Sequence, residues 1–329
     1  MLTGAGRYWM RRVIAKCLVV LVGTTLFQVV FANAQAYPSK PIRIITNAAG
    51  GGNDFIARLV GPPLSKLLGQ SIVIENRPAA AFPAQVVAKS PPDGYTLLIS
   101  GGTFWIGTLL QDDLPYNIST DFLPITLLGT SPNILVVHPS LPVKNVKDLI
   151  ALAKAKPGQL NYASPSIGAA QHLAAELLKS MAKVDIVRIS YRGTAPALMA
   201  VVSGETHITF ATASAAPIIK SSKLRALAVT DTKRSSFFPE LPTMAESGFP
   251  GYEANAMQGI FAPAKTPAAI VNRLHDDLAS VLRSSDVKER LATFGIEAGG
   301  SSPAAFSLMV SSEMSRMGKV IKEAKIRAE

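Results

Sequence analysis

The sequence is poor in cysteine and aromatic residues and has no long uninterrupted apolar run. Cys17 is the single cysteine of the 329 residues, and it lies in an N-terminal segment that we expect to be removed. The mature chain is therefore expected to have no disulfide, thiol nucleophile or cysteine-ligated metal. The apolar stretch Leu18–Phe31 is shorter than the roughly 20 residues that a membrane-spanning helix needs, and no later run is long enough.

Signatures of catalysis are also missing. The sequence has no Gly-x-Ser-x-Gly and no His-Glu-x-x-His, and its four histidines, His138, His172, His207 and His275, are far apart. We expect a protein that is not an enzyme and has no cofactor or metal. One alternative stays open, a secreted α/β hydrolase that uses a loop serine such as Ser166 with His172 as its base.

The N-terminus has the composition of a signal peptide, predicted over residues 1–36. Arg7, Arg11, Arg12 and Lys16 precede the apolar stretch, and residues 32–36 offer two small-x-small cleavage sites. We expect export to the periplasm, through either the general secretory route or the twin-arginine route.

The net charge is +11, and removal of the four basic residues of that segment leaves +7. Nucleic-acid binding favours basic clusters interleaved with stacking aromatics, whereas lysines such as Lys144, Lys147 and Lys154 are scattered along helices. No nucleic-acid partner is expected, but a small anion is compatible with this charge.

Short apolar strands alternate with amphipathic helices from Tyr37 onward, which predicts an α/β fold. The pair Pro62-Pro63 should kink or split the helix that follows the loop Gly50–Asp54. The predicted strands are 42–46, 72–75, 96–100, 133–138, 160–163, 186–190, 208–212, 224–229 and 258–262, and the predicted helices include 146–156, 169–181, 267–283 and 303–325.

Two extended segments, Thr130–Pro139 and Met257–Pro263, look like crossings between two lobes. A chain that crosses twice makes a hinged pair of lobes with a cleft, where ligands commonly bind. We predict lobe 1 over residues 37–135 and 258–329, and lobe 2 over residues 136–257.

Three strand-to-helix loops could bind an anion through free backbone amides: Gly50–Asp54, Ser100–Thr103 and Ala163–Ala169. Ligands of open α/β sheets bind beyond the carboxyl ends of strands, so the three loops could meet. None has the spacing or the lysine of a phosphate-binding loop, so a nucleotide is not expected.

Several of these stretches, together with others, resemble the extracytoplasmic solute receptors of tripartite tricarboxylate transporters, also called Bug-like receptors. The matching stretches are Tyr37–Ile44, Gly50–Asp54, Glu75–Pro78, Pro92–Leu97, Lys156–Ser164, Lys223–Thr230 and Leu241–Thr243.

The resemblance implies a two-lobed, hinged periplasmic binding protein of type II that closes over a small carboxylate. It also implies a monomer that delivers this ligand to two membrane subunits of a transporter. A sensor subunit that presents the ligand to a signalling partner would have the same sequence features. Carried over by position, the ligand residues are Gly51, Gly52, Asn53, Asp54, Gly101, Thr103, Ser164, Ser166, Gly168, Ala169 and Thr212.

Three departures from the family pattern leave the ligand's identity open. Ala49 and Asn53 stand where the family usually has proline and threonine, and Ala79–Pro83 replaces a glycine-rich loop. Phe210–Thr212 lacks an acidic residue that the family often has at Ala211.

Overall fold

The computed structural model describes residues 37–47, 49–77, 82–111, 113–165, 167–191 and 193–326. The chain forms two units, residues 1–39 and 40–329, and only Tyr37–Ser39 of the first is described. The predicted signal peptide lies outside the described residues. Every described helix and strand belongs to the second unit.

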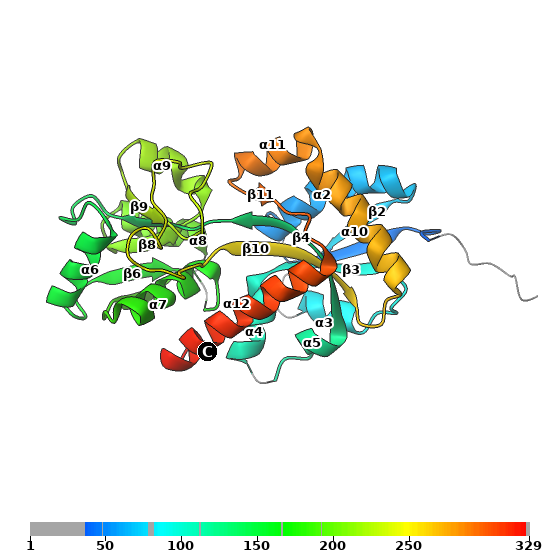
Figure 1. Ribbon diagram of the computed structural model, residues 1–329, viewed down its shortest axis with the longest axis horizontal. Helices are drawn as coiled ribbons and strands as arrows, with labels where there is room; N and C mark the ends of the chain where they lie inside the picture. Colours follow the sequence, from blue (N-terminus) through cyan, green and yellow to red (C-terminus); the bar gives the residue numbers. More distant parts are fainter. Residues whose placement is uncertain are drawn as a thin grey trace, which may run out of the picture. The chain divides into compact units, whose positions relative to one another are not determined.

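The first of two mixed sheets has six strands and contains the strand that precedes the loop Gly50–Asp54 (Figure 1). Its strands, in spatial order, are β11 (Glu297–Ala298), β4 (Phe122–Ser131), β10 (Ala256–Pro263), β3 (Thr96–Gly101), β1 (Ile42–Thr46) and β2 (Ile72–Asn76). β1 pairs in parallel with β2 and β3, whereas β10 is antiparallel to both β3 and β4. The parallel strands place the loops after β1 and β3 at the same edge of the sheet.

The helices of this half are α2 (Gly52–Leu68), α3 (Phe82–Ala88), α4 (Gly102–Leu110), α5 (Ile118–Asp121), α10 (Ala268–Arg283), α11 (Ser285–Thr293) and α12 (Pro303–Glu323).

The second sheet has five strands. In spatial order they are β7 (Val187–Ser190), β6 (Asn161–Ser164), β8 (Ile208–Ala211), β5 (Ile134–Val137) and β9 (Arg225–Val229). β6 is parallel to β7 and β8, and β5 is antiparallel to β8 and β9. Its helices are α6 (Val146–Ala155), α7 (Ala170–Ala182), α8 (Thr194–Val202) and α9 (Ala216–Lys220), with a 3-10 turn at Ala213–Ala215.

Each predicted strand overlaps an observed one, and the four predicted helices are present, so the α/β prediction is confirmed. The predictions lack the two-residue strand β11 and also β4, the ten-residue strand before the first crossing. Its sequence, FLPITLLGTS, contains Pro124 and Gly129 and is buried at most positions, so it shows no alternation of apolar and polar residues.

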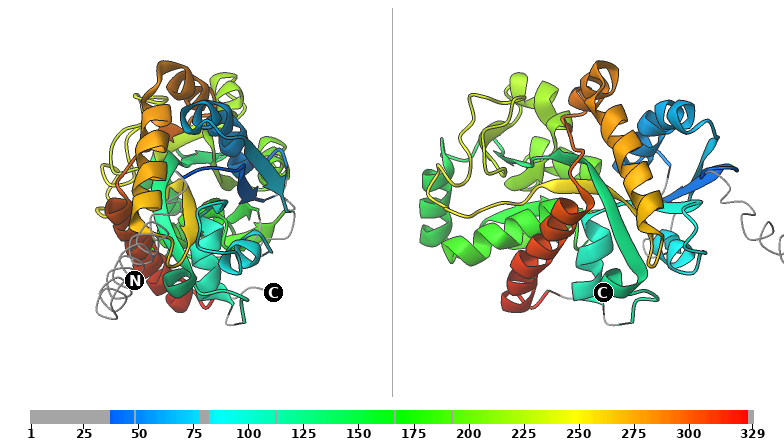
Figure 2. Two further views of the ribbon diagram at one scale, coloured as in Figure 1. Left: turned by 90° about the vertical axis from the view of Figure 1, so that its right-hand side faces the viewer. Right: turned by 45° about the vertical axis from the view of Figure 1, so that its right-hand side comes forward.

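The chain passes from the first sheet to the second between β4 and β5, and returns where β10 begins. The lobe boundaries predicted after residues 135 and 257 fall inside β5 and β10, and they stay a prediction. A third connection is α12, which packs on β4 and α4 and then on α7 of the second half (Figures 1 and 2).

Helix α2 runs without interruption through Pro62 and Pro63, so the prediction of a split helix is wrong. Pro62 has no N–H to donate to the Arg58 carbonyl. Because Arg58 and Pro62 are both exposed, water can bond that carbonyl instead. The opposite face, with Ile56, Val60 and Leu64, is fully buried, and this packing holds the helix together across the prolines.

Among the described residues, no helix combines the length and apolar character needed to cross a bilayer.

Candidate ligand-binding site

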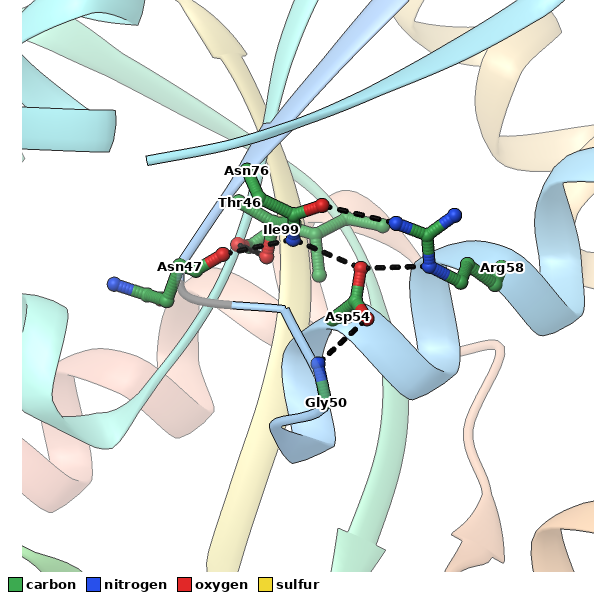
Figure 3. A network of polar contacts seen from close by, with 7 residues as sticks. All are labelled: Thr46, Asn47, Gly50, Asp54, Arg58, Asn76 and Ile99. Carbon is green, nitrogen blue, oxygen red and sulfur yellow. Dashed lines mark hydrogen bonds and ion pairs between the residues drawn. The ribbon is translucent and has the colours of Figure 1, made fainter. Parts of the chain in front are cut away.

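The buried carboxylate of Asp54 closes the loop between β1 and α2 (Figure 3). Its Oδ2 accepts a hydrogen bond from the Gly50 N–H at 2.9 Å, while Oδ1 accepts from Arg58 Nε at 2.9 Å and Asn76 Nδ2 at 2.8 Å. Burial disfavours the charged form of Asp54, but the hydrogen bonds from Gly50, Arg58 and Asn76 outweigh it and lower the pKa. The Asp54 carboxylate therefore holds the glycine loop in one conformation.

Asn76, at the end of β2, joins the same network (Figure 3). Its Nδ2 also donates to the Asn47 carbonyl at 2.9 Å, and its Oδ1 accepts from Arg58 Nη2 at 2.9 Å. Because Asn76 bonds both the loop and α2, it fixes where α2 begins. Asn76 of the Glu75–Pro78 stretch therefore has a structural role.

The loop between β3 and α4 lies close against the returning strand. A Cβ on Gly101 would stand 3.0 Å from the Met257 carbonyl oxygen and 3.5 Å from Asn53 Oδ1. Only glycine permits this approach without a shift of the backbone. Gly101 therefore lets the first turns of α2 and α4 lie side by side at β10.

The loop between β6 and α7 comes from the second sheet. Gly168 has φ +78, which favours glycine, and a Cβ there would lie 2.7 Å from Leu110 Cδ1 of α4, so the Leu110 side chain would also have to move. The Gly168 N–H donates to His172 Nδ1 at 3.2 Å. Burial, with a smaller contribution from Arg188 and against the opposing effect of Glu176, lowers the pKa of His172 to about 4. His172 is therefore neutral at pH 7 with Nδ1 already used, which leaves the hydrolase alternative without a free base at that atom.

The three loops meet at a cavity of about 220 Å³ that also touches β10 and α12. The helices α2, α4 and α7 begin there, and none has a side-chain hydrogen bond at its N-cap. Their first N–H groups lack partners within the helix, and the helix dipoles add positive potential. The lining residues that the structure describes include no lysine, arginine or histidine: they are Gly52, Asn53, Gly101, Gly102, Thr103, Gly168, Ala169, Ala170, Gln171, Leu173, Asn255, Ala256, Met257, Gln258 and Glu313.

The structure brings together six of the predicted ligand residues, namely Gly52, Asn53, Gly101, Thr103, Gly168 and Ala169. Of the others, Gly51 is the N-cap of α2, and Asp54 lies in the network described above. Ser164 is fully buried and its Oγ accepts from Arg188 Nε at 2.8 Å, while Thr212 follows β8; neither lines the cavity. Ser166 lies outside the described residues. The ligand-binding role of all these residues stays a prediction.

Four polar residues of the cavity have no counterpart among the predicted ligand residues: Gln171 on α7, Asn255 before β10, Gln258 on β10 and Glu313 on α12. Gln258 belongs to the extended segment that predicts a crossing, and its buried Oε1 has no hydrogen-bond partner in the part of the chain that the structure describes. Glu313 is part of no motif, and only the packing of α12 against α4 brings it to the cavity.

Larger hollows of about 460 and 560 Å³ lie elsewhere, beside Leu308 and Met309 of α12 and around the C-terminal end of that helix. We favour the smaller cavity because uncapped helix N-termini from both halves open into it, as an anion site requires. No group of three or more His, Cys, Asp or Glu residues in the described part of the chain could hold a metal ion.

A comparison with known families matches residues 56–326 to the receptor of the tripartite tricarboxylate transporter family. Among individual relatives, the protein BugT of Bordetella pertussis is 33% identical over 297 residues, which cover 88% of this chain and 91% of BugT.

Solved structures give the same picture. The chain is similar to Rpa4515 of R. palustris, solved with adipate, at 36% identity and a TM-score of 0.76, with coverage of 89% of this chain and all of that one. It is similar to MatC of Rhodopseudomonas palustris, solved with bound malate, at 30% identity, a TM-score of 0.73 and coverage of 87% and 100%. The periplasmic binding protein BugD gives 30% identity and a TM-score of 0.73 over 89% of this chain and all of BugD.

These matches confirm the predicted fold class, a two-lobed α/β periplasmic binding protein of type II with a hinge and a cleft between the lobes. They also extend over nearly all of the described residues, and they agree with the receptor resemblance carried by the sequence. The chain belongs to the tripartite tricarboxylate transporter family of receptors.

Proposed function

We propose that this protein is a periplasmic receptor that captures a small carboxylate in the cavity between its two sheets. The observation that carries the proposal is the convergence of three helix N-termini without side-chain caps, on α2, α4 and α7. Bare amides at such termini bind anions without a basic side chain. The adipate and malate of the two related structures support a carboxylate as the anion.

The cavity suits a small acid better than a phosphate-rich ligand. With no cationic side chain among its described lining residues, a ligand of high negative charge would be poorly neutralised. Amide contacts together with closure of the two lobes are consistent with a micromolar dissociation constant, which corresponds to about −8 kcal/mol.

Calorimetric titration of the purified, ligand-stripped protein tests the proposal. The panel should contain adipate, malate, other di- and tricarboxylates, acidic amino acids and aromatic acids, with adipamide as the uncharged counterpart of adipate. We expect at least one acid to bind and adipamide not to bind. If none of the acids binds, the proposal fails.

A charge placed at the start of α7 tests the site. Ala170 is the first residue of α7, and Asp at this position is favourable for the helix itself. We expect Ala170→Asp to weaken carboxylate binding by about tenfold or more, because it puts a negative charge into the cavity. Ala268→Asp makes the same change at the first residue of α10, outside the cavity, and should leave the affinity unchanged. Equal affinities in the two variants would show that the ligand binds elsewhere.

We further propose that the ligand is handed, by a monomeric receptor, to two membrane subunits of a transporter. Uptake of a labelled carboxylate by cells that carry or lack the receptor gene tests this step. We expect uptake to depend on the receptor. Unimpaired uptake, with loss of a transcriptional response to the acid, would favour the sensor alternative.

A further inference from the structure

Glu313 is a buried carboxyl group on the wall of the ligand cavity. Its side chain projects from α12, and the residue is 7% exposed. Oε2 accepts a hydrogen bond from Trp105 Nε1 at 2.6 Å. Oε1 has no hydrogen-bond partner among the described residues, and it would lie 3.7 Å from a Cβ on Gly102, the first residue of α4. One oxygen of this carboxyl group is thus fixed, while the other faces the N-terminus of a helix that opens into the cavity.

No cation within the described structure forms an ion pair with Glu313. On its own helix, Arg316 is nearest in sequence, but its Nη1 donates to Glu253 Oε2 at 2.9 Å, in the segment before β10. The other packed elements, β4 and α4, have no ionisable side chain. On α7, Glu176 is bonded to Tyr162 and Lys179, and His172 is bonded to the Gly168 N–H.

Burial without a paired cation favours the uncharged acid, against the positive potential of the α4 N-terminus. Burial raises the pKa of Glu313 to about 7, against the lowering effects of the Trp105 hydrogen bond and of Arg316; Glu253 adds to the rise. A carboxylate ligand in the same small cavity would place a negative charge beside Glu313. A like charge so close to Glu313 disfavours its ionisation further.

We propose that Glu313 is a ligand-contacting residue that donates a hydrogen bond from Oε1–H to a carboxylate bound in the cavity, so that ligand and proton bind together. The inference rests on the proposed function. An O–H donor to a carboxylate gives a short, charge-assisted hydrogen bond, whereas the ionised Glu313 would repel the same ligand. The proton comes from solvent and stays on Glu313, and no covalent bond is formed or broken.

The test measures proton uptake on binding, with adipate and malate as probes. Both carboxyl groups of these probes are largely ionised above about pH 6.5. Titration of the wild-type protein in two buffers of different ionisation enthalpy, near pH 7.5, should show uptake of most of one proton per ligand. The affinity should fall by about tenfold or more between about pH 6.5 and about pH 8.5, because only the acid form binds well.

The variant Glu313→Gln keeps a donor at this position and removes the ionisation. We expect its affinity to be independent of pH, with no proton uptake, and to exceed that of the wild type at high pH. Glu323→Gln changes an exposed glutamate of the same helix and should behave as the wild type.

Trp105 gives a readout that needs no variant. In the chain without residues 1–36 it is the only tryptophan, and its Nε1 is bonded to Glu313. Its emission should titrate near neutral pH in the free protein and stop titrating there when ligand is saturating.

The outcomes separate the two proposals. If an acid binds with no proton uptake and a flat pH profile in the wild type, the role of Glu313 is wrong and the receptor function stands. If no acid binds at any pH, the receptor function fails, and the role of Glu313 fails with it.

Discussion

At the scale of single residues, two buried carboxyl groups near the cavity have opposite surroundings. Asp54 accepts hydrogen bonds from three donors, which keep its pKa below the ordinary value despite burial. Glu313 accepts one, from Trp105, and burial dominates. Asp54 is thereby suited to a structural role as a permanent anion, whereas Glu313 can change its charge within the neutral range.

Glu313 therefore makes the stability of the free protein depend on pH. Its pKa is raised in the folded state, so the folded chain keeps a proton that the unfolded chain has lost between about pH 4.5 and about pH 7. The free energy of unfolding should decrease as the pH rises through this window and then stay constant, with a total change on the order of 3 kcal/mol.

Urea denaturation of the wild type and of Glu313→Gln at about pH 5 and about pH 8 measures this contribution. We expect the variant to be more stable relative to the wild type at the higher pH than at the lower. A stability difference that does not change with pH would show that Glu313 ionises as freely when folded as when unfolded.

At the scale of elements, the two crossing strands are tied together by buried hydrogen bonds. The Asn133 N–H donates to Thr230 Oγ1 at 2.9 Å, and Asn133 Nδ2 donates to the Ala254 carbonyl at 2.7 Å. Thr230 Oγ1 also donates to that carbonyl at 3.1 Å. These bonds join the start of β5, the end of β9 and the start of β10, so the connections between the halves lie in fixed register.

Removal of the Asn133 side chain should weaken this junction. We expect Asn133→Ala to lower the free energy of unfolding by about 2 kcal/mol, because a fully buried amide and its hydrogen bond are lost. Asn272→Ala, an exposed change on α10, should have little effect in the same urea titration. Equal stability of the two variants would mean that the Asn133 side chain does not stabilise this junction.

At the scale of the whole described molecule, the cavity is built from both halves. Its lining includes the first turns of α2 and α4 from one half and of α7 from the other, with β10 and α12 between them. A ligand that touches all of these elements binds the folded arrangement and not the unfolded chain. It should therefore stabilise the entire second unit, residues 40–329.

Thermal unfolding with and without ligand tests this coupling. At a ligand concentration about 100 times the dissociation constant, stabilisation of about 2.7 kcal/mol is expected, enough to raise the melting temperature by several degrees. The Ala170→Asp variant, at the same ligand concentration, should show a much smaller rise. A full rise in that variant would indicate that the ligand acts outside this cavity.

The fold class and the positions of the three strand-to-helix loops could be predicted from the sequence, because both depend on local patterns. Strand and helix periods are visible along the chain, and the glycines of Gly50–Gly52 and Gly101 follow predicted strands. The split predicted for α2 had the same local basis, yet burial of one helix face keeps the helix continuous through Pro62 and Pro63. The strand β4 escaped prediction because a strand buried at most positions has no alternation to detect.

The sequence by itself determined an α/β fold and three strand-to-helix loops that contain six residues lining the cavity, since such loops lie at the carboxyl ends of strands, and its resemblance to a known family indicated the two-lobed receptor class. Only the tertiary structure decided that Asp54 holds its loop by a hydrogen bond from Gly50 and that Gln258 lines the cavity. It also decided that Glu313, on a helix more than 200 residues beyond Trp105, lines the same cavity without an ion-pair partner among the described residues. The reason is physical: burial, and the donors that surround a carboxyl group, depend on contacts between distant segments, and they set its charge more strongly than its neighbours in sequence do.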